Sequence, residues 1–178
     1  MAEAGVTKKV LAYALKSLMA SRPLSKITVG DICEACDMNR KSFYYHFRDK
    51  YDLVNWIFYT EFFDEFHREA SEGADALLRL CLFFEKHREF YRNALRRQGQ
   101  DSFYEYLGQV ISPVIASRLA PYVATDPYRD FYTDLMMHIY RDAIVRWVMD
   151  RDPVPAQTFV QLMYRAAAVL GKISLPQA

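Results

Sequence analysis

The sequence predicts an all-α protein, with a three-helix N-terminal head and a larger helical C-terminal body. Apolar residues recur at intervals of three and four along most of the chain, which is the spacing of one helix face. No segment shows sustained alternation of apolar and polar residues, so strands are not expected. The 178 residues are 52% hydrophobic and 15% aromatic, which allows a sizeable core and argues against global disorder.

The first helix is amphipathic. Thr7 is its expected N-cap, and Arg22 and Pro23 are expected to end it. Its apolar stripe is formed by Val10, Leu11, Ala14, Leu15 and Leu18.

Residues 28–47 predict two short helices joined by a tight turn. Thr28 is the expected N-cap of the first, and Asn39 caps the second, which runs through Phe47. Asp37 lies at the turn between them. The buried face of the first helix is expected to be Val29, Ile32, Cys33 and Cys36, at helical spacing.

The body is expected to begin at residue 51, after a head of residues 1–50. Asp49 should cap a fourth helix, whose apolar residues are Leu53, Trp56, Ile57, Phe63 and Phe66. Further helices are predicted over residues 75–93, 101–119, 127–150 and 156–172. Pro113 should kink the 101–119 helix, and residues 121–127 form the next connection.

Charge is distributed unevenly between the two parts. Residues 1–50 hold nine Lys and Arg against five Asp and Glu, a net charge of +4, whereas residues 51–178 carry −3. A basic head on an acidic body is typical of a protein in which one part meets phosphate. The odd number of cysteines, the absence of a secretory signal pattern and the lack of a long apolar run indicate a cytoplasmic protein.

Catalytic and metal chemistry are disfavoured. Cys33 and Cys36 form a C-x2-C pair with no second pair, and both lie on the apolar stripe, so we interpret them as buried small residues. His46 has no second histidine or carboxylate pair at ligand spacing. We therefore expect no enzyme activity, no metal and no cofactor.

The helix after Asn39 carries side chains suited to DNA. Beyond Phe43 and Phe47, which we expect in the core, it offers positive charge and long hydrogen-bonding groups. A recognition helix needs cations for phosphates and donors that reach base edges in the major groove. The alternative is an ordinary solvated helix.

The stretch from Ile27 to Leu53 resembles the TetR family of transcription factors. In that family the helix-turn-helix ends in Tyr-x-His-Phe followed by Lys and Leu. Those places are held here by Tyr44, Tyr45, His46, Phe47, Lys50 and Leu53. Two residues depart from the pattern: Asp37 stands where glycine is usual, and Lys41 where a small residue is common.

The resemblance implies roles for individual residues. Arg40, Lys41 and Tyr45 are the candidates for base edges. Thr28 is expected to present its hydroxyl and amide to a phosphate. The complete set of predicted DNA-binding residues is Thr28, Asn39, Arg40, Lys41, Ser42, Tyr44, Tyr45, His46 and Lys50.

The resemblance also implies a ligand-binding and dimerisation body, which the fourth helix would link to the head. The predicted ligand-binding residues are Trp56, Tyr59, Phe63, Phe84, His87, Tyr91, Tyr104 and Tyr140, although such aromatic stripes are more often plain core. The last two helices are the expected dimer surface, through Met136, Met137, Tyr140, Ile144, Trp147, Val148, Phe159, Leu162, Met163, Ala166 and Leu170. The alternative is that they only complete the monomer core.

Within the family, the segment Phe83–Leu107 resembles regulators of the dihydroxyacetone-kinase type, some of which work through a protein co-regulator. The overall prediction is a homodimeric transcriptional regulator, with repression as the expected sign, that binds a palindromic operator in double-stranded DNA. A small apolar or aromatic ligand, or a protein co-regulator, would control it. The rival interpretations are an enzyme, a helical protein–protein adaptor, and an activator that is driven by a co-regulator and has no small-molecule pocket of its own.

Overall fold

The computed structural model of the protein describes residues 2–68, 75–96 and 102–170. Every regular element within these ranges is helical, which confirms the predicted fold class. The elements are α1 (Ala2–Met19), the 3-10 helix η1 (Leu24–Lys26), α2 (Val29–Glu34), α3 (Arg40–His46), α4 (Lys50–Arg68), α5 (Ala76–Lys86), α6 (Arg88–Leu95), α7 (Phe103–Val123), α8 (Arg129–Met149) and α9 (Ala156–Leu170). None of these helices combines the length and apolar character needed to cross a membrane.

Local side-chain contacts set the ends of the short helices, as predicted. The Thr28 hydroxyl accepts from the Asp31 amide, and the Asn39 side chain accepts from the Ser42 amide. Asp37 has φ 52°, in the left-handed region that ends α2 and turns the chain.

Three helix boundaries differ from the predictions. The first helix begins at Ala2 and not at Thr7; three of the residues before Thr7, Ala2, Glu3 and Ala4, are good helix formers. The predicted 75–93 helix is two helices, α5 and α6, separated at His87 with φ −110° and ψ 24°. The helix that contains Pro113 continues through Pro121 to Val123, since a proline in the last turn removes one hydrogen bond only.

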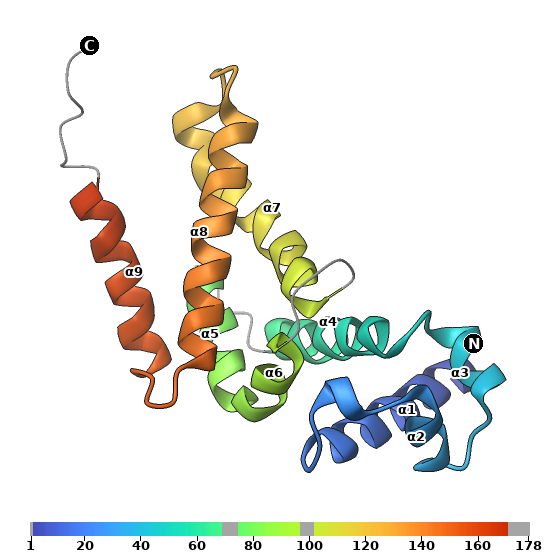
Figure 1. The fold of residues 1–178 in the computed structure, drawn as a ribbon. Coiled ribbons are helices and arrows are strands. Elements are labelled where there is room, and N and C mark those ends of the chain that lie inside the picture. Colours follow the sequence, from blue (N-terminus) through green and yellow to red (C-terminus); the bar gives the residue numbers. More distant parts are fainter. Residues whose placement is uncertain (1, 69–74, 97–101, 171–178) are drawn as a thin grey trace.

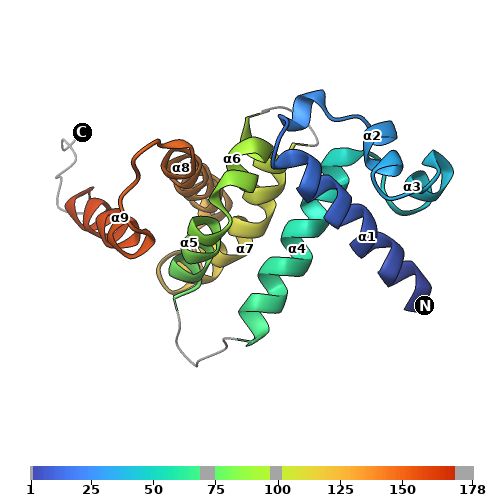
Figure 2. The ribbon, with the colours of Figure 1, turned by 90° about the horizontal axis from the view of Figure 1, so that it is seen from below.

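The helices form a head (α1 to α3) and a body (α4 to α9), which α4 joins (Figure 1). In the body, α7 packs along α8, and α9 packs on α5. The short helix α6 lies between α1 of the head and the end of α8 in both views (Figures 1 and 2).

Aromatic residues form the centre of the body. Phe58 of α4 is fully buried and lies within 6 Å of the rings of Phe84, Tyr91 and Phe103. These rings come from α4, α5, α6 and α7, so the cluster holds four helices together. The head has its own buried residues, chiefly Leu11, Leu15, Ile32, Phe43 and Phe47.

Candidate nucleic-acid interface and body cavity

Helix α3 has one buried side and one exposed side. Phe43 is 0% exposed and Phe47, which follows the helix, is 3% exposed, so both anchor the segment in the head core. On the other side Tyr45 is 83% and Tyr44 58% exposed, and Lys41 is exposed as well. Phenol and ammonium groups on a firmly anchored helix can donate hydrogen bonds to phosphates and base edges.

Arg40 is exposed but lies back over α2. Its guanidinium is so close to Gly30 that a Cβ there would lie 2.6 Å from Nη2. Because the contact is made by the end of a flexible side chain, Arg40 can leave it by rotamer changes alone. Arg40 must therefore swing outward from α2 to reach a base.

The other polar residues of this segment are Asn39, Ser42 and His46. The Asn39 carboxamide oxygen accepts from the Ser42 amide at 2.8 Å, so the Asn39 side chain caps α3. Ser42 and His46 are partly buried, and the His46 ring meets Tyr45 edge-on at 4.9 Å. This places Ser42 and His46 beside the exposed tyrosines.

Thr28 does not offer the free donors that the sequence suggested. Its amide donates to Asp31 Oδ2 at 2.7 Å, and its hydroxyl donates to the same oxygen at 2.9 Å. These hydrogen bonds are the chief reason that the pKa of the Asp31 carboxyl is lowered. In this conformation Thr28 is a helix cap, and both of its donors are engaged by the Asp31 carboxyl.

Lys50 is engaged inside the protein. Its ammonium donates to the carbonyl oxygens of Leu24 at 2.7 Å and Ile27 at 2.5 Å. Leu24 and Ile27 are both buried, so Lys50 ties the start of α4 to the segment that precedes α2. A phosphate could reach only the third ammonium hydrogen.

The C-x2-C cysteines lie on the apolar face of α2 as expected. Cys33 is buried and Cys36 is partly buried, and burial raises the pKa of both thiols. The Cys36 thiol donates to the Ile32 carbonyl at 3.2 Å. In the described ranges, no three or more His, Cys, Asp or Glu residues gather into a metal site.

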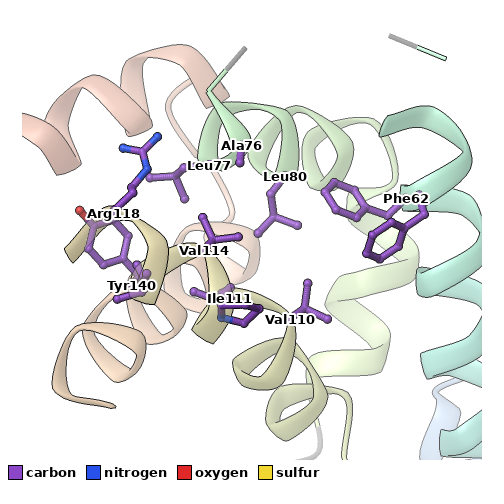
Figure 3. Close-up of a pocket in the computed structure, with 12 residues that line it drawn as sticks. Phe62, Ala76, Leu77, Leu80, Val110, Ile111, Val114, Arg118 and Tyr140 are labelled. Carbon is purple, nitrogen blue, oxygen red and sulfur yellow. The ribbon is translucent and has the colours of Figure 1, made fainter. Parts of the chain in front are cut away.

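The body contains a cavity of about 260 Å³ between α4, α5, α7 and α8 (Figure 3). Its wall is almost wholly aliphatic and aromatic, and the polar groups at its lining belong to Arg118 and Tyr140. Such a space suits a small apolar molecule. The lining residues are Phe62, Phe63, Ala76, Leu77, Leu80, Val110, Ile111, Pro113, Val114, Ile115, Arg118 and Tyr140.

Three polar side chains meet beside this cavity. Arg118 of α7 lies 2.6 Å from Asp75, the cap of α5, and donates to the Tyr164 hydroxyl of α9 at 2.8 Å. The Tyr164 hydroxyl in turn donates to Asp75. Burial and this bond raise the pKa of Tyr164 to about 12, so its phenol stays protonated. The cluster connects the cavity wall to α5 and α9.

The structure does not bring the eight predicted ligand-binding residues together. Phe63 and Tyr140 line the cavity. Phe84 and Tyr91 are fully buried in the aromatic cluster around Phe58, which is the plain-core alternative.

The other predicted lining residues lie elsewhere in the structure. Trp56 lies beside α1, with the Lys8 ammonium 5.8 Å from its ring, and Tyr59 is 54% exposed. His87 lies 3.3 Å from a Glu65 oxygen. Tyr104 lies under the Arg141 guanidinium at 3.8 Å and donates to Asp142 at 2.5 Å, so it belongs to the α7–α8 contact.

Sequence reasoning missed most of the cavity wall, because it sought aromatic residues with polar groups. The available signal was the apolar run from Val110 to Ile115 around Pro113. Periodicity alone cannot distinguish such a run from ordinary core.

Comparisons with known proteins agree with this geometry. Residues 12–57 match the family described as "Bacterial regulatory proteins, tetR family", and residues 72–168 match "Transcriptional regulator C-terminal region". The chain is 29% identical over 89 residues to the "HTH-type dhaKLM operon transcriptional activator DhaS" of Lactococcus lactis subsp. lactis (strain IL1403). That match covers 49% of this chain and 48% of that protein, so it spans about half of the relative.

A solved structure has the same fold. "Dihydroxyacetone kinase operon activator DhaS" aligns with a TM-score of 0.59 over 96% of this chain and 99% of that chain, at 19% identity. The C-terminal family match alone covers more than half of this chain, and the N-terminal match contains the helix-turn-helix. The chain therefore belongs to the TetR family and is a DNA-binding transcriptional regulator of that family.

Proposed function

We propose that the protein binds a palindromic operator as a homodimer, with α3 of each subunit in the major groove. The observation that carries this proposal is the two-sided character of α3, with buried phenylalanines behind and exposed Lys41, Tyr44 and Tyr45 in front. The +4 charge of residues 1–50 favours approach to phosphates. We assign Arg40, Lys41 and Tyr45 to base edges, and Ser42, Tyr44 and His46 to the backbone.

Enrichment of binding sites from a random DNA library, followed by fluorescence anisotropy at several salt concentrations, tests this proposal. Arg40→Ala should relax base discrimination by about 1–3 kcal/mol at one position of each half-site. Arg129→Ala, an exposed arginine on α8, is the matched control and should leave binding unchanged. Absence of any enriched sequence at low salt would end the proposal.

We propose that the subunits pair through α8 and α9. Leu135 and Ile139 are exposed at i and i+4 on α8, and Leu162 and Val169 are exposed at i and i+7 on α9. Each pair shares a helix face. Ile144, Trp147 and Val148, which the sequence placed on the dimer surface, are buried within the subunit core and are left out of the proposed interface.

Sedimentation of aspartate variants tests the pairing. Ile139→Asp and Leu162→Asp should each shift the protein toward monomer, because a carboxylate would be buried without a partner. Leu82→Asp, on the exposed side of α5, should leave the oligomeric state unchanged. A monomeric wild-type protein, or dimers in all three variants, would contradict the assignment.

A small apolar ligand is the proposed effector, because the cavity wall offers aliphatic and aromatic contacts from four helices. The neutral dye Nile red serves as a probe. Val114→Phe should fill the cavity and abolish dye fluorescence, whereas Ala116→Phe, on the exposed side of the same helix, should not. Equal fluorescence of both variants would place the dye elsewhere and favour control by a protein co-regulator.

Repression is the first candidate for the sign of regulation, because a dimer bound to an operator that overlaps a promoter blocks transcription. Activation is the second candidate, favoured by the names of the two similar proteins, both called activators. Transcript levels of genes beside the operator, with and without the protein, decide between the two signs. We further propose that the protein acts in the cytoplasm and needs neither catalysis nor a cofactor.

A further inference from the structure

The cavity of the body has two chemically different ends. Figure 3 shows Arg118 and Tyr140 together at one end, and Phe62 and Val110 at the other. Apart from Arg118 and Tyr140, every side chain that lines the cavity is a hydrocarbon. A molecule in the cavity therefore meets hydrogen-bonding side chains at one end only.

The charge of Arg118 is balanced within the protein. Arg118 Nη2 donates to Asp75 Oδ1 at 2.6 Å, and its Nη1 donates to the Tyr164 hydroxyl at 2.8 Å. Asp75 also accepts from the Leu77 amide at 3.0 Å and from the Tyr164 hydroxyl. Tyr164 is uncharged, because its pKa is raised to about 12. The polar end of the cavity thus carries one positive and one negative charge, and they are already paired with each other.

Tyr140 supplies the hydrogen-bonding group that remains available. Within residues 2–68, 75–96 and 102–170 its hydroxyl has no hydrogen-bond partner, although the side chain is partly buried. Burial raises the pKa of Tyr140, while Arg118 nearby lowers it and Asp75 raises it, and the net shift is upward. The phenol therefore keeps its proton at neutral pH. A hydroxyl in this position gains from any ligand oxygen that accepts its hydrogen.

A ligand with a charged head fits poorly at this end. An anionic head would meet the Asp75 carboxylate, because Arg118 is already paired with Asp75. A cationic head would meet the Arg118 guanidinium for the same reason. Either head would leave water without gaining a free counter-charge, and an unpaired charge is costly to bury. A neutral oxygen avoids this cost and accepts from Tyr140.

We infer that the cavity selects a neutral apolar molecule with a single hydroxyl or carbonyl oxygen that binds Tyr140, and that the Asp75–Arg118 pair excludes molecules with charged heads. The rest of the molecule lies among the hydrocarbon side chains toward Phe62. A cavity of about 150 Å³ takes up benzene, so one of about 260 Å³ has room for a chain of about eight carbons. This selection rests on the proposed role of the cavity as the effector site and adds the chemistry of the effector.

Titration of the full chain with three straight-chain probes, followed by methyl NMR, tests the selection. The probes are octanol, octanoate and octylamine, which are neutral, anionic and cationic at neutral pH. The methyl signals of Leu77, Leu80 and Val114 report occupancy, because these side chains line the cavity. Octanol should bind about a hundredfold or more tightly than either charged probe, since both charged heads lack a partner.

Two charge variants test the role of the ion pair. Asp75→Asn removes the carboxylate but keeps a residue that can cap α5, so Arg118 loses its counter-charge. Octanoate should then bind about tenfold or more tightly than it binds wild type, while octanol changes by less than about twofold. Arg118→Gln is the mirror variant, in which octylamine should gain by a similar factor. Either variant alone tests the exclusion of charged heads.

Tyr140→Phe tests the position of the ligand oxygen. Loss of one neutral hydrogen bond should weaken octanol binding by about threefold to tenfold. Tyr132→Phe is the matched control, because Tyr132 is a partly buried tyrosine on the same helix that does not line the cavity. Its octanol affinity should equal that of wild type. Equal octanol binding by wild type and Tyr140→Phe would remove Tyr140 from the site.

The titrations separate failure of the selection from failure of the proposed effector site. Octanoate or octylamine that binds wild type as tightly as octanol would overturn the selection and leave the cavity as a ligand site. Unchanged affinity for the charged probes in both Asp75→Asn and Arg118→Gln would do the same. If none of the three probes shifts the cavity methyl signals, the proposed effector site fails, and the selection fails with it.

Discussion

Replacing Lys50 with methionine should lower the stability of the whole protein. The Lys50 ammonium makes two hydrogen bonds, at 2.7 Å to the Leu24 carbonyl and 2.5 Å to the Ile27 carbonyl. Methionine keeps the length of the side chain and removes both donors. Since Lys50 is partly exposed, we take the lower end of the range for charged hydrogen bonds, about 2–3 kcal/mol for the pair.

Thermal unfolding followed by circular dichroism measures this loss. For a chain of this size the expected fall in Tm is about 4–12 °C. Lys41→Met is the matched control, because Lys41 is exposed on α3, and its stability should change by no more than about 0.5 kcal/mol. In DNA titrations, Lys41→Met should instead relax base discrimination at one position of each half-site, because Lys41 is assigned to base edges.

The family resemblance assigns Lys50 to the DNA backbone, whereas its two carbonyl partners assign it to the stability of the fold. The two roles predict opposite effects of Lys50→Met on melting temperature and on DNA binding. Suppose Lys50→Met melts at the wild-type temperature and lowers the slope of log K against log salt by about 0.9 for each phosphate whose charge is no longer neutralised. Lys50 would then serve the phosphates, and the reasoning from its two carbonyl partners would be refuted.

Three further predictions concern the turn, the cap and one ion-pair cluster. Asp37→Gly should stabilise the protein by about 0.5–1 kcal/mol, because glycine adopts φ 52° without steric cost; a lower Tm would contradict this. Asn39→Ala should lower the unfolding free energy by about 1 kcal/mol, because α3 loses its cap. Asn39→Asp should keep the cap but weaken DNA binding, because its negative charge repels phosphates. Equal DNA affinity of Asn39→Asp and wild type would place residue 39 away from the phosphates. Burial raises the pKa of the Glu65 carboxyl, but hydrogen bonds from Lys86 and His87 outweigh it, and the net shift is downward. The lowered pKa of Glu65 adds stability that is fully present above the unfolded pKa of about 4.3 and is lost as pH falls through the folded pKa. Denaturant melts between about pH 5 and 3 should therefore show a smaller loss of unfolding free energy for Glu65→Gln than for wild type. Identical profiles of the two proteins would exclude the Glu65, Lys86 and His87 cluster as a source of acid sensitivity.

The sequence supported most of what depends on neighbours a few residues apart. The caps at Thr28 and Asn39 involve amides three residues on, and the turn at Asp37 depends on its own φ. The buried places of Phe43 and Phe47 follow from helical spacing around the family motif. Such features can be predicted because the interacting groups and the geometry that joins them lie within one turn of chain.

The position of a residue in the cavity or in the core could not be predicted in this way. Tyr91 and Phe84 carry the residue types of a ligand pocket, yet both are fully buried among other rings. Leu80 and Val114 line the cavity although nothing in their type distinguishes them from core. Whether an apolar side chain meets another side chain or an empty space depends on how helices cross, and periodicity carries no information about crossing angles.

The helical class, the head with its two-sided third helix, and the family were all accessible from the order of residues alone. The packed fold was needed to show that Lys50 directs its ammonium to the carbonyl groups of buried residues, that the cavity lies among aliphatic and aromatic residues of α4, α5, α7 and α8, and that Asn93 of α6 accepts a hydrogen bond from the Leu24 amide. The physical reason is distance along the chain. Asn93 and its partner Leu24 are 69 residues apart, and only the packed core brings such groups within hydrogen-bonding distance.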